Sequence, residues 1–266
     1  MQPTYSPQTT RILGLLALLI IALWTLVTPP GILGKADAVG YAICHRIAER
    51  TFHVHDRPLP LCARCTGIYL GILVGLGLFA ARGRLRAAKF PPLPLLAIVI
   101  GVNAFYVVDG VNSYFSLFES YRPIYQPHNT LRLITGTGFG LAMITLVLPM
   151  FNMILWRRPP QTAPLRNLLD LLILYVAAAG VIVLVLLEQP AILIAAGLLS
   201  AAGVLLMFGI VGCIGFLTLA GGENTLETWR DLQAPALAGL IFAFLVIGGI
   251  DLARYLLTGT WDGFVF

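Results

Sequence analysis

Long apolar runs recur along the whole chain, and they constrain the fold more than any other feature. A helix that crosses a bilayer needs about 20 predominantly apolar residues, because each residue adds only about 1.5 Å to its length. Such runs cover residues 12–28, 66–81, 93 to about 108, 131–156, 168–187, 191 to about 221, and 234–257. The sequence therefore predicts an all-α, polytopic membrane protein with about seven transmembrane helices.

Composition supports this fold class. Of the 266 residues 58% are hydrophobic and only 11% are charged, and the mean hydropathy is +0.88. A soluble domain carries roughly 25% charged residues, so a soluble globular, disordered or disulfide-stapled secreted protein is excluded. The net charge of +5 is typical of the cytoplasmic flanks of a membrane protein, and the expected partner is the lipid bilayer rather than nucleic acid.

The first apolar run has a second interpretation. Ala36-Asp37-Ala38 resembles the cleavage site of a signal peptide. The run is longer than a usual signal-peptide core and only Arg11 precedes it, which favours an uncleaved first helix.

Basic residues next to the helix ends indicate the orientation. The two sides carry nearly equal numbers of Lys and Arg, but Arg82, Arg84 and Arg86, and the pair Arg157–Arg158, directly follow apolar runs. Positive charge beside a helix end favours the cytoplasmic side. We therefore expect a plasma (inner) membrane protein with a cytoplasmic N-terminus and an extracytoplasmic loop between the first two spans.

Glycines at helical spacing indicate how the spans pack. Gly67, Gly71 and Gly75 recur every four residues in the second span, and Gly136 and Gly140 repeat this in the fourth. Small residues let helix backbones approach closely in lipid, so helix packing is the favoured interpretation and a glycine-lined channel the alternative. The sixth span carries Gly203, Gly209, Gly212 and Gly215.

The loop from residue 34 to 66 concentrates the reactive side chains of the chain. It holds three of the four cysteines and three of the four histidines. Residues 37–50 are predicted to form a short amphipathic helix at the membrane interface. Cys62 and Cys65 form a Cys-x-x-Cys at the start of the second span, where the positive helix end and Arg64 favour thiolates.

Three interpretations of these cysteines compete. In the first, Cys44, Cys62 and Cys65 bind zinc with a histidine as the fourth ligand, as in structural Cys₃His sites. In the second, Cys62 and Cys65 are a redox pair and Cys44 is the resolving thiol. In the third, a disulfide or buried thiols simply fasten the loop. The candidates for the fourth ligand are His45, which is adjacent to Cys44, then His53, His55 and His128.

Ionisable residues at the membrane edge form a second group on the same side. Asp109 ends the third span, Asn129 and Arg132 open the fourth, and Arg64 lies between the two cysteines. These four residues are expected to form a polar rim beside the thiols, with Asp109 and Arg132 as a possible pair, or else ion pairs that only hold helix ends. Asp170 is expected to form a surface pair with Arg166.

Two sequence blocks resemble a known family. The first runs from Cys44-His45-Arg46 to Cys62-Ala63-Arg64-Cys65-Thr66-Gly67, and the second from Asp109-Gly110 to Asn129-Thr130-Leu131-Arg132. Together they are similar to an uncharacterised family of prokaryotic membrane proteins, domain of unknown function 2085, over about residues 41–140. The resemblance implies a membrane protein with a Cys-His-Arg and Cys-x-x-Cys site, and implies no reaction. This chain differs from the family pattern in its longer, aromatic segment 111–128.

These observations lead to a hypothesis about organisation and function. Residues 1–156 are expected to form a membrane domain with the Cys/His site, and residues 157–266 an added packing or partner-binding part. The favoured function is a zinc–thiolate site at the extracytoplasmic face, with Cys44, Cys62, Cys65 and His45 as ligands. The alternatives are a quinone-linked thiol-disulfide oxidoreductase and a noncatalytic subunit of a larger membrane complex.

Overall fold

The protein is a helical bundle in which every predicted span is a helix. A computed structural model describes residues 5–118 and 122–263. Seven of the helices in these ranges are long and apolar enough to cross a membrane, as predicted. The elements are α1 (Pro7–Val27), α2 (Gly31–Ile43), a 3₁₀ turn (Ala48–Arg50), β1 (His53–Val54), β2 (Arg57–Pro58), α3 (Ala63–Ala81), α4 (Leu93–Phe115), α5 (Asn129–Leu155), α6 (Leu168–Leu186), α7 (Pro190–Leu219) and α8 (Gln233–Thr258).

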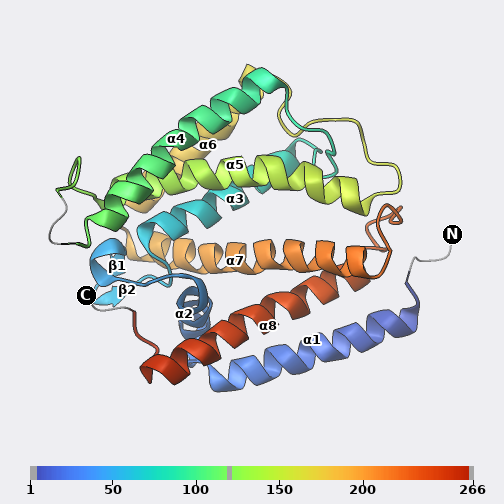
Figure 1. Cartoon of the computed structure of the whole chain (residues 1–266), viewed down its shortest axis with the longest axis horizontal. Helices are drawn as coiled ribbons and strands as arrows, with labels where there is room; N and C mark the ends of the chain where they lie inside the picture. The colour runs from blue at the N-terminus through green and yellow to red at the C-terminus, as the bar shows by residue number, and fades with distance from the viewer. Residues whose placement is uncertain (1–4, 119–121, 264–266) are drawn as a thin grey trace.

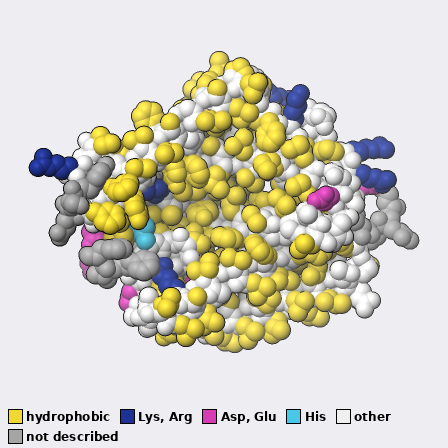
Figure 2. Space-filling view, viewed as in Figure 1, with side chains coloured by type: hydrophobic (Ala, Val, Ile, Leu, Met, Phe, Trp, Pro, Cys, Tyr) yellow, Lys and Arg dark blue, Asp and Glu magenta, His cyan; other side chains and the backbone are white. Residues whose placement is uncertain are grey.

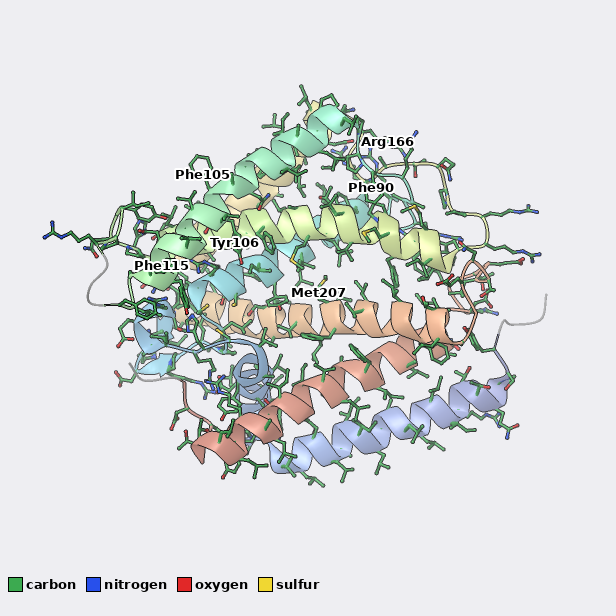
Figure 3. All side chains as sticks on the ribbon, viewed as in Figure 1. Phe90, Phe105, Tyr106, Phe115, Arg166 and Met207 are labelled. Atoms are coloured by element: carbon green, nitrogen blue, oxygen red, sulfur yellow. The ribbon has the colours of Figure 1, made fainter. Side chains whose placement is uncertain are left out.

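The bundle has two ends that differ in character (Figure 1). One end, called here the thiol end, holds α2, the hairpin β1–β2 and the end of α8, and α1 begins at the other end. Figure 3 places Phe115 at the thiol end and Arg166 at the opposite end. Hydrophobic side chains cover the middle of the face shown in Figure 2, and basic side chains project from both ends. This is the distribution that a bilayer-spanning protein requires.

The α3–α5 pair is the closest helix contact, and its glycines explain why. A Cβ on Gly71 would lie 2.4 Å from the Thr137 carbonyl oxygen, and one on Gly140 would lie 1.9 Å from that of Ile68. Gly67 and Gly136 meet the partner backbone in the same way. These four contacts confirm that the glycine faces of α3 and α5 serve helix packing. On α7 the pattern is mixed. A Cβ on Gly203 or Gly212 would meet a neighbouring helix, whereas one on Gly209 or Gly215 would meet no atom within 4 Å, although Gly239 of α8 packs against the Gly209 carbonyl.

The remaining helices pack around this pair. α4 lies against α5, where Tyr106, labelled in Figure 3, stacks on Phe139 with ring centroids 4.2 Å apart. α7 packs on α3 and on α8, and α1 packs on α8 (Figure 1). The proposed boundary at residue 156 stays a prediction.

Two local predictions were wrong. Residues 37–50 do not form one interfacial helix, because α2 spans residues 31–43 and is mostly buried. α2 ends at Ile43, and Cys44 is extended. Gly40, in its last turn, packs closely against the Pro60 carbonyl, since a Cβ at this position would lie 1.9 Å from that oxygen. α4 continues seven residues past Val108, since its terminal polar residues bond within the protein rather than end the helix.

Asp170 is not a surface partner of Arg166. It is 3% exposed and forms ion pairs with Arg82 (2.5 Å) and Arg84 (2.6 Å), while Arg166 contributes its backbone N–H. The carboxylate therefore joins the end of α3 to the start of α6. This pairing was not predicted because Arg82 and Arg84 are far from Asp170 in the sequence.

Candidate functional site

The segment between α2 and α3 delivers three cysteines to one place. Cys44 is the residue at which α2 ends, Cys62 is the residue before the first turn of α3, and Cys65 lies in that turn. The intervening loop is closed by the β1–β2 hairpin and by a bond from the Leu59 N–H to the Phe52 carbonyl, 2.9 Å. The two ends of the loop are thereby held against each other.

The sulfurs converge in this arrangement. The Cys62 backbone N–H donates to Cys44 Sγ at 3.3 Å. One ligand atom each from Cys44, His45 and Cys62 lies within 4.8 Å of the other two, and among the described residues Cys65 does not belong to this group. All three cysteines are free thiols, with Cys44 and Cys62 buried. We call Cys44, Cys62, Cys65 and His45 the thiol site.

Electrostatics at the site favour a thiolate on Cys44. Hydrogen bonds from Cys62 and Cys65 hold the pKa of Cys44 well below its usual value, with help from the backbone N–H groups of Arg46 and Cys62, although burial raises it. The N-terminus of α3, with its positive dipole end, lies at the same point. A thiolate is the form of cysteine that binds metal or attacks a disulfide.

The geometry of His45 depends on the unusual backbone of the next residue. Arg46 has φ of +51°, a left-handed conformation that costs a non-glycine residue about 1 kcal/mol or more. The turn lets the Ile47 N–H donate to His45 Nδ1 at 3.0 Å. Arg46 is itself anchored by Asp37 (3.0 Å) and by the Trp261 carbonyl (3.0 Å).

The other histidines are placed elsewhere. His53 lies on the exposed side of β1, and His55 occupies the turn of the hairpin. His128 caps α5 by accepting the Leu131 N–H at Nδ1, 3.3 Å. Within residues 5–118 and 122–263, none of these three belongs to a group of three potential ligands.

A buried polar network surrounds Asp109 beside the thiol site. Arg64 Nη2 forms an ion pair with Asp109 Oδ2 at 2.5 Å, and Asp109 is 1% exposed. The same carboxylate accepts bonds from the Tyr125 hydroxyl (2.9 Å) and the Thr135 hydroxyl (3.3 Å). Because Arg64 lies between Cys62 and Cys65, this network directly positions the first turn of α3.

Arg132 does not pair with Asp109 as the sequence suggested. Its Nε and Nη2 donate to Ser113 Oγ (3.1 and 3.0 Å), and its Nη1 donates to Asn129 Oδ1 (2.9 Å). Arg64 forms the ion pair with the Asp109 carboxylate instead. Asn129 Nδ2 donates to the carbonyls of Glu49 and Thr51, so α5 is tied to the loop that carries the thiols.

Sequence reasoning missed three contributors to this site. Ser113 and Tyr125 complete the polar network, and Arg254 of α8 donates from Nη1 to the carbonyls of Tyr41 (2.5 Å) and Cys44 (2.8 Å). The spacing of Asp109 and Ser113, one helical turn apart, was a usable signal for a polar helix face. Arg254, one turn after Asp251, is a charge at the same membrane edge, which indicated its side of the membrane but not its partners. Tyr125 carried no signal, since its contact is decided by the fold.

Comparison with known proteins identifies a family for the part of the chain that holds these residues. Residues 44–146 match the family described as predicted membrane protein (DUF2085). An uncharacterised protein of Methanocaldococcus jannaschii is 33% identical over 121 residues, 46% of this chain and 71% of the relative. The chain belongs to the DUF2085 family.

A second relative covers a similar region. An uncharacterised protein of Methanothermobacter thermautotrophicus is 39% identical over 109 residues, 40% of this chain and 86% of that protein. No solved structure matches the chain. The DUF2085 match begins at Cys44 and ends inside α5, so it contains the thiol site, the Asp109 network and most of the α3–α5 pair.

Proposed function

We propose that this membrane protein binds one zinc ion at the thiol site, with the thiolates of Cys44, Cys62 and Cys65 as ligands. The observation that carries the proposal is the convergence of Cys44, His45 and Cys62 from both ends of one loop, with the free thiol of Cys65 in the first turn of the same helix. Zinc–sulfur bonds of about 2.3 Å in a tetrahedron place two sulfurs roughly 3.8 Å apart. The spacing of the ligand atoms at the site, within 4.8 Å for Cys44, His45 and Cys62, is close to that requirement.

His45 is the proposed fourth ligand. Its Nδ1 accepts a bond from Ile47, so this nitrogen is the unprotonated one in the neutral ring. An unprotonated nitrogen is what zinc requires, and the metal would replace the Ile47 N–H as its partner. If His45 is not a ligand, the fourth position is open to water or substrate, as in catalytic zinc sites.

The proposed role of the metal is to fasten the loop. Cys44 and Cys62 stand at the ends of the 17-residue segment between them, and the hairpin and the 3₁₀ turn bury few side chains of their own. A metal that crosslinks both ends removes conformations from the unfolded loop and so stabilises its folded form. The site would then hold the end of α2 against the first turn of α3.

The orientation is part of the proposal. Arg82, Arg84 and Arg86 follow α3, and Arg157–Arg158 follow α5, all at the end opposite the thiol site. The positive-inside rule then puts that end in the cytoplasm and the thiol site at the extracytoplasmic face of the plasma membrane.

A second function is favoured by one specific feature. Cys62 and Cys65 stand at the N-terminus of α3, the position where redox-active cysteine pairs gain a low-pKa thiolate. A thiol-disulfide oxidoreductase would form a Cys62–Cys65 disulfide, with the two electrons passing to an acceptor such as a quinone. Zinc binding and this disulfide exclude each other, so one experiment separates them.

The experiment measures metal and thiol state on the same sample. The full chain is purified in detergent without chelators, zinc is determined by elemental analysis, and thiols are alkylated before nonreducing mass spectrometry. We expect about one zinc per chain, lost in Cys44→Ser and Cys62→Ser, and retained in the control Cys213→Ser. His45→Ala tests the fourth ligand by zinc affinity. A metal-free protein with a Cys62–Cys65 disulfide would refute the zinc proposal and support the redox function.

A further inference from the structure

A groove between α1 and α8 contains a buried carboxyl group that the thiol site does not use. Its volume is about 680 Å³, and its apolar wall includes Leu23, Val27 and Leu245. These three side chains are exposed on the surface of the bundle that faces lipid. The groove therefore opens to the bilayer rather than to water.

Asp251 is the polar residue that distinguishes this groove. Its side chain lines the groove and is 3% exposed, and Oδ2 accepts the Trp24 Nε1–H at 3.0 Å. Oδ1 is buried and has no hydrogen-bond partner among the described residues. An unbonded carboxyl oxygen in apolar surroundings is costly, so it requires a functional explanation.

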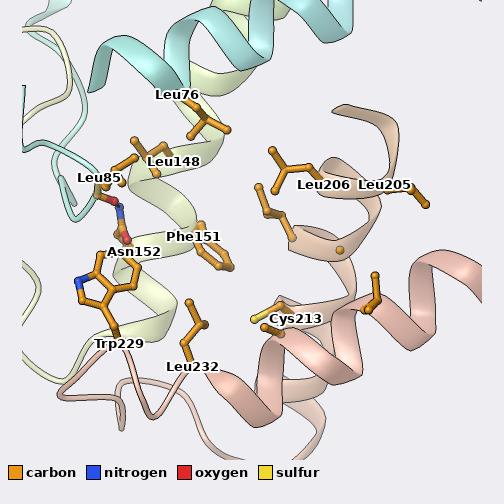
Figure 4. Close-up of a pocket in the computed structure, with 14 residues that line it drawn as sticks. Leu76, Leu85, Leu148, Phe151, Asn152, Leu205, Leu206, Cys213, Trp229 and Leu232 are labelled. Carbon is orange, nitrogen blue, oxygen red and sulfur yellow. Dashed lines mark hydrogen bonds between the residues drawn. The ribbon is translucent and has the colours of Figure 1, made fainter. Parts of the chain in front are cut away.

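A second apolar cavity serves as a comparison, because its polar lining residue is fully hydrogen-bonded. That cavity, about 380 Å³ at the opposite end of the bundle, lies between α5, α7 and α8 (Figure 4). Asn152 in its wall is already bonded, donating to the carbonyls of Leu85 and Ala87 and accepting the Trp156 Nε1–H. The side-chain amide of Asn152 is therefore already hydrogen-bonded at both its nitrogen and its oxygen, unlike Asp251 Oδ1. It offers no unpaired group that would select a ligand.

We infer that the groove binds a membrane-soluble alcohol: a molecule with an apolar body and one hydroxyl group that bonds to Asp251 Oδ1. The apolar wall and the lipid-facing opening select an occupant that partitions into the bilayer. A hydroxyl group bonds to either form of the carboxyl, because it donates to a carboxylate and accepts from a carboxylic acid. An ammonium group, in contrast, can only donate.

The groove also adjoins the thiol site through α8. Arg254, one turn after Asp251, donates to the Cys44 carbonyl, and Trp261 of the groove wall stacks near Tyr41 with ring centroids 5.1 Å apart. A ligand in the groove therefore contacts the helix that anchors the end of α2. The binding site itself does not depend on zinc, so the two proposals can fail separately.

The test uses the full chain reconstituted in phosphatidylcholine vesicles. The probe is a long-chain alkanol with a photoreactive diazirine, and labelled peptides are mapped by mass spectrometry. We expect labelling to concentrate on α1 and the second half of α8, and to be competed by the unlabelled alkanol but not by the alkane of equal length, which has no group that bonds to either form of the carboxyl. Asp251→Ala should reduce this labelling about tenfold, the value of one hydrogen bond to a carboxyl group.

A second variant blocks the groove without touching the carboxyl. A Cβ on Gly249 meets no atom within 4 Å, and this residue lines the groove, so the side chain of Gly249→Leu is expected to occupy part of it. Gly180→Leu is the matched control, because Gly180 is equally unobstructed and lies on α6. Labelling should fall in Gly249→Leu and persist in Gly180→Leu, with zinc content equal in both. Labelling spread evenly over all lipid-facing helices, or competed equally by the alkane, would overturn the inference.

Discussion

Arg64, the third residue of the Cys-Ala-Arg-Cys sequence, forms a 2.5 Å ion pair with Asp109 of α4. The two family sequence blocks, which are far apart in the chain, therefore meet in one contact. Thr135 of α5 bonds to the same carboxylate. The orientation of the first turn of α3, and with it Cys62 and Cys65, depends on a charge held by two other helices.

This ion pair makes the first prediction. Asp109→Ala leaves Arg64 without its buried partner and should lower the free energy of unfolding by about 3 kcal/mol. Arg64→Ala should cost less, because the Arg64 side chain is 18% exposed and Asp109 keeps its bonds to Tyr125 and Thr135. Unfolding in mixed detergent–SDS micelles measures both, and a double-mutant cycle with no coupling energy would refute the role of the pair.

The α3–α5 contact makes the second prediction. Gly140→Ala places a Cβ 1.9 Å from the Ile68 carbonyl oxygen and should destabilise the protein by about 2 kcal/mol, because the backbones must separate. Gly138→Ala on the same helix meets no atom of another element and should be neutral or slightly stabilising. Equal unfolding midpoints for the two variants would contradict this account of the packing.

The bond between Trp24 and Asp251 makes the third prediction. Trp24→Phe leaves the buried carboxyl without its donor and should cost about 1–3 kcal/mol. Adding Asp251→Leu removes the unsatisfied group, so the double variant should be more stable than Trp24→Phe alone. Thermal unfolding followed by circular dichroism measures the order of the three proteins, and the reverse order would show that the carboxyl carries no cost.

Metal removal makes the fourth prediction. A chelator should increase hydrogen exchange in residues 44–62 while α3 and α5, which are held by their glycine contacts, keep their protection. Adding zinc back should restore the slow exchange. A uniform increase in hydrogen exchange across the bundle after chelation would mean that the metal stabilises the whole fold rather than the loop alone.

Orientation makes the fifth prediction. An alkaline phosphatase reporter fused after residue 55 should be active, because the hairpin is proposed to face the extracytoplasmic side, and one fused after residue 158 should be inactive. A green fluorescent protein reporter at the same positions should give the opposite pattern. Phosphatase activity of the fusion after residue 158 would show that the membrane orientation is the opposite of the one proposed, while the fold would be unaffected.

Much of the fold was predictable because lipid imposes a simple rule. A span must be apolar, long and helical, since its backbone groups have no other partners in the hydrocarbon, so the seven spans follow from the order of residues. The ends were less predictable where polar residues continue a helix, as at Asp109 and Asn112 in α4. There the polar side chains bond to other elements, which a linear pattern does not show.

The sequence alone determined that Cys44, Cys62, Cys65 and His45 share one loop, because their proximity is local along the chain. The tertiary structure decided which charge meets which: Arg64 rather than Arg132 reaches Asp109, and Arg82 and Arg84 rather than the Arg166 side chain reach Asp170. Such pairings depend on which helix faces are adjacent, and the α3–α5 glycine contacts set those faces. For the same reason the sequence does not reveal the groove at Asp251, because its walls come from α1 and α8, which are distant in the chain and adjacent only in the fold.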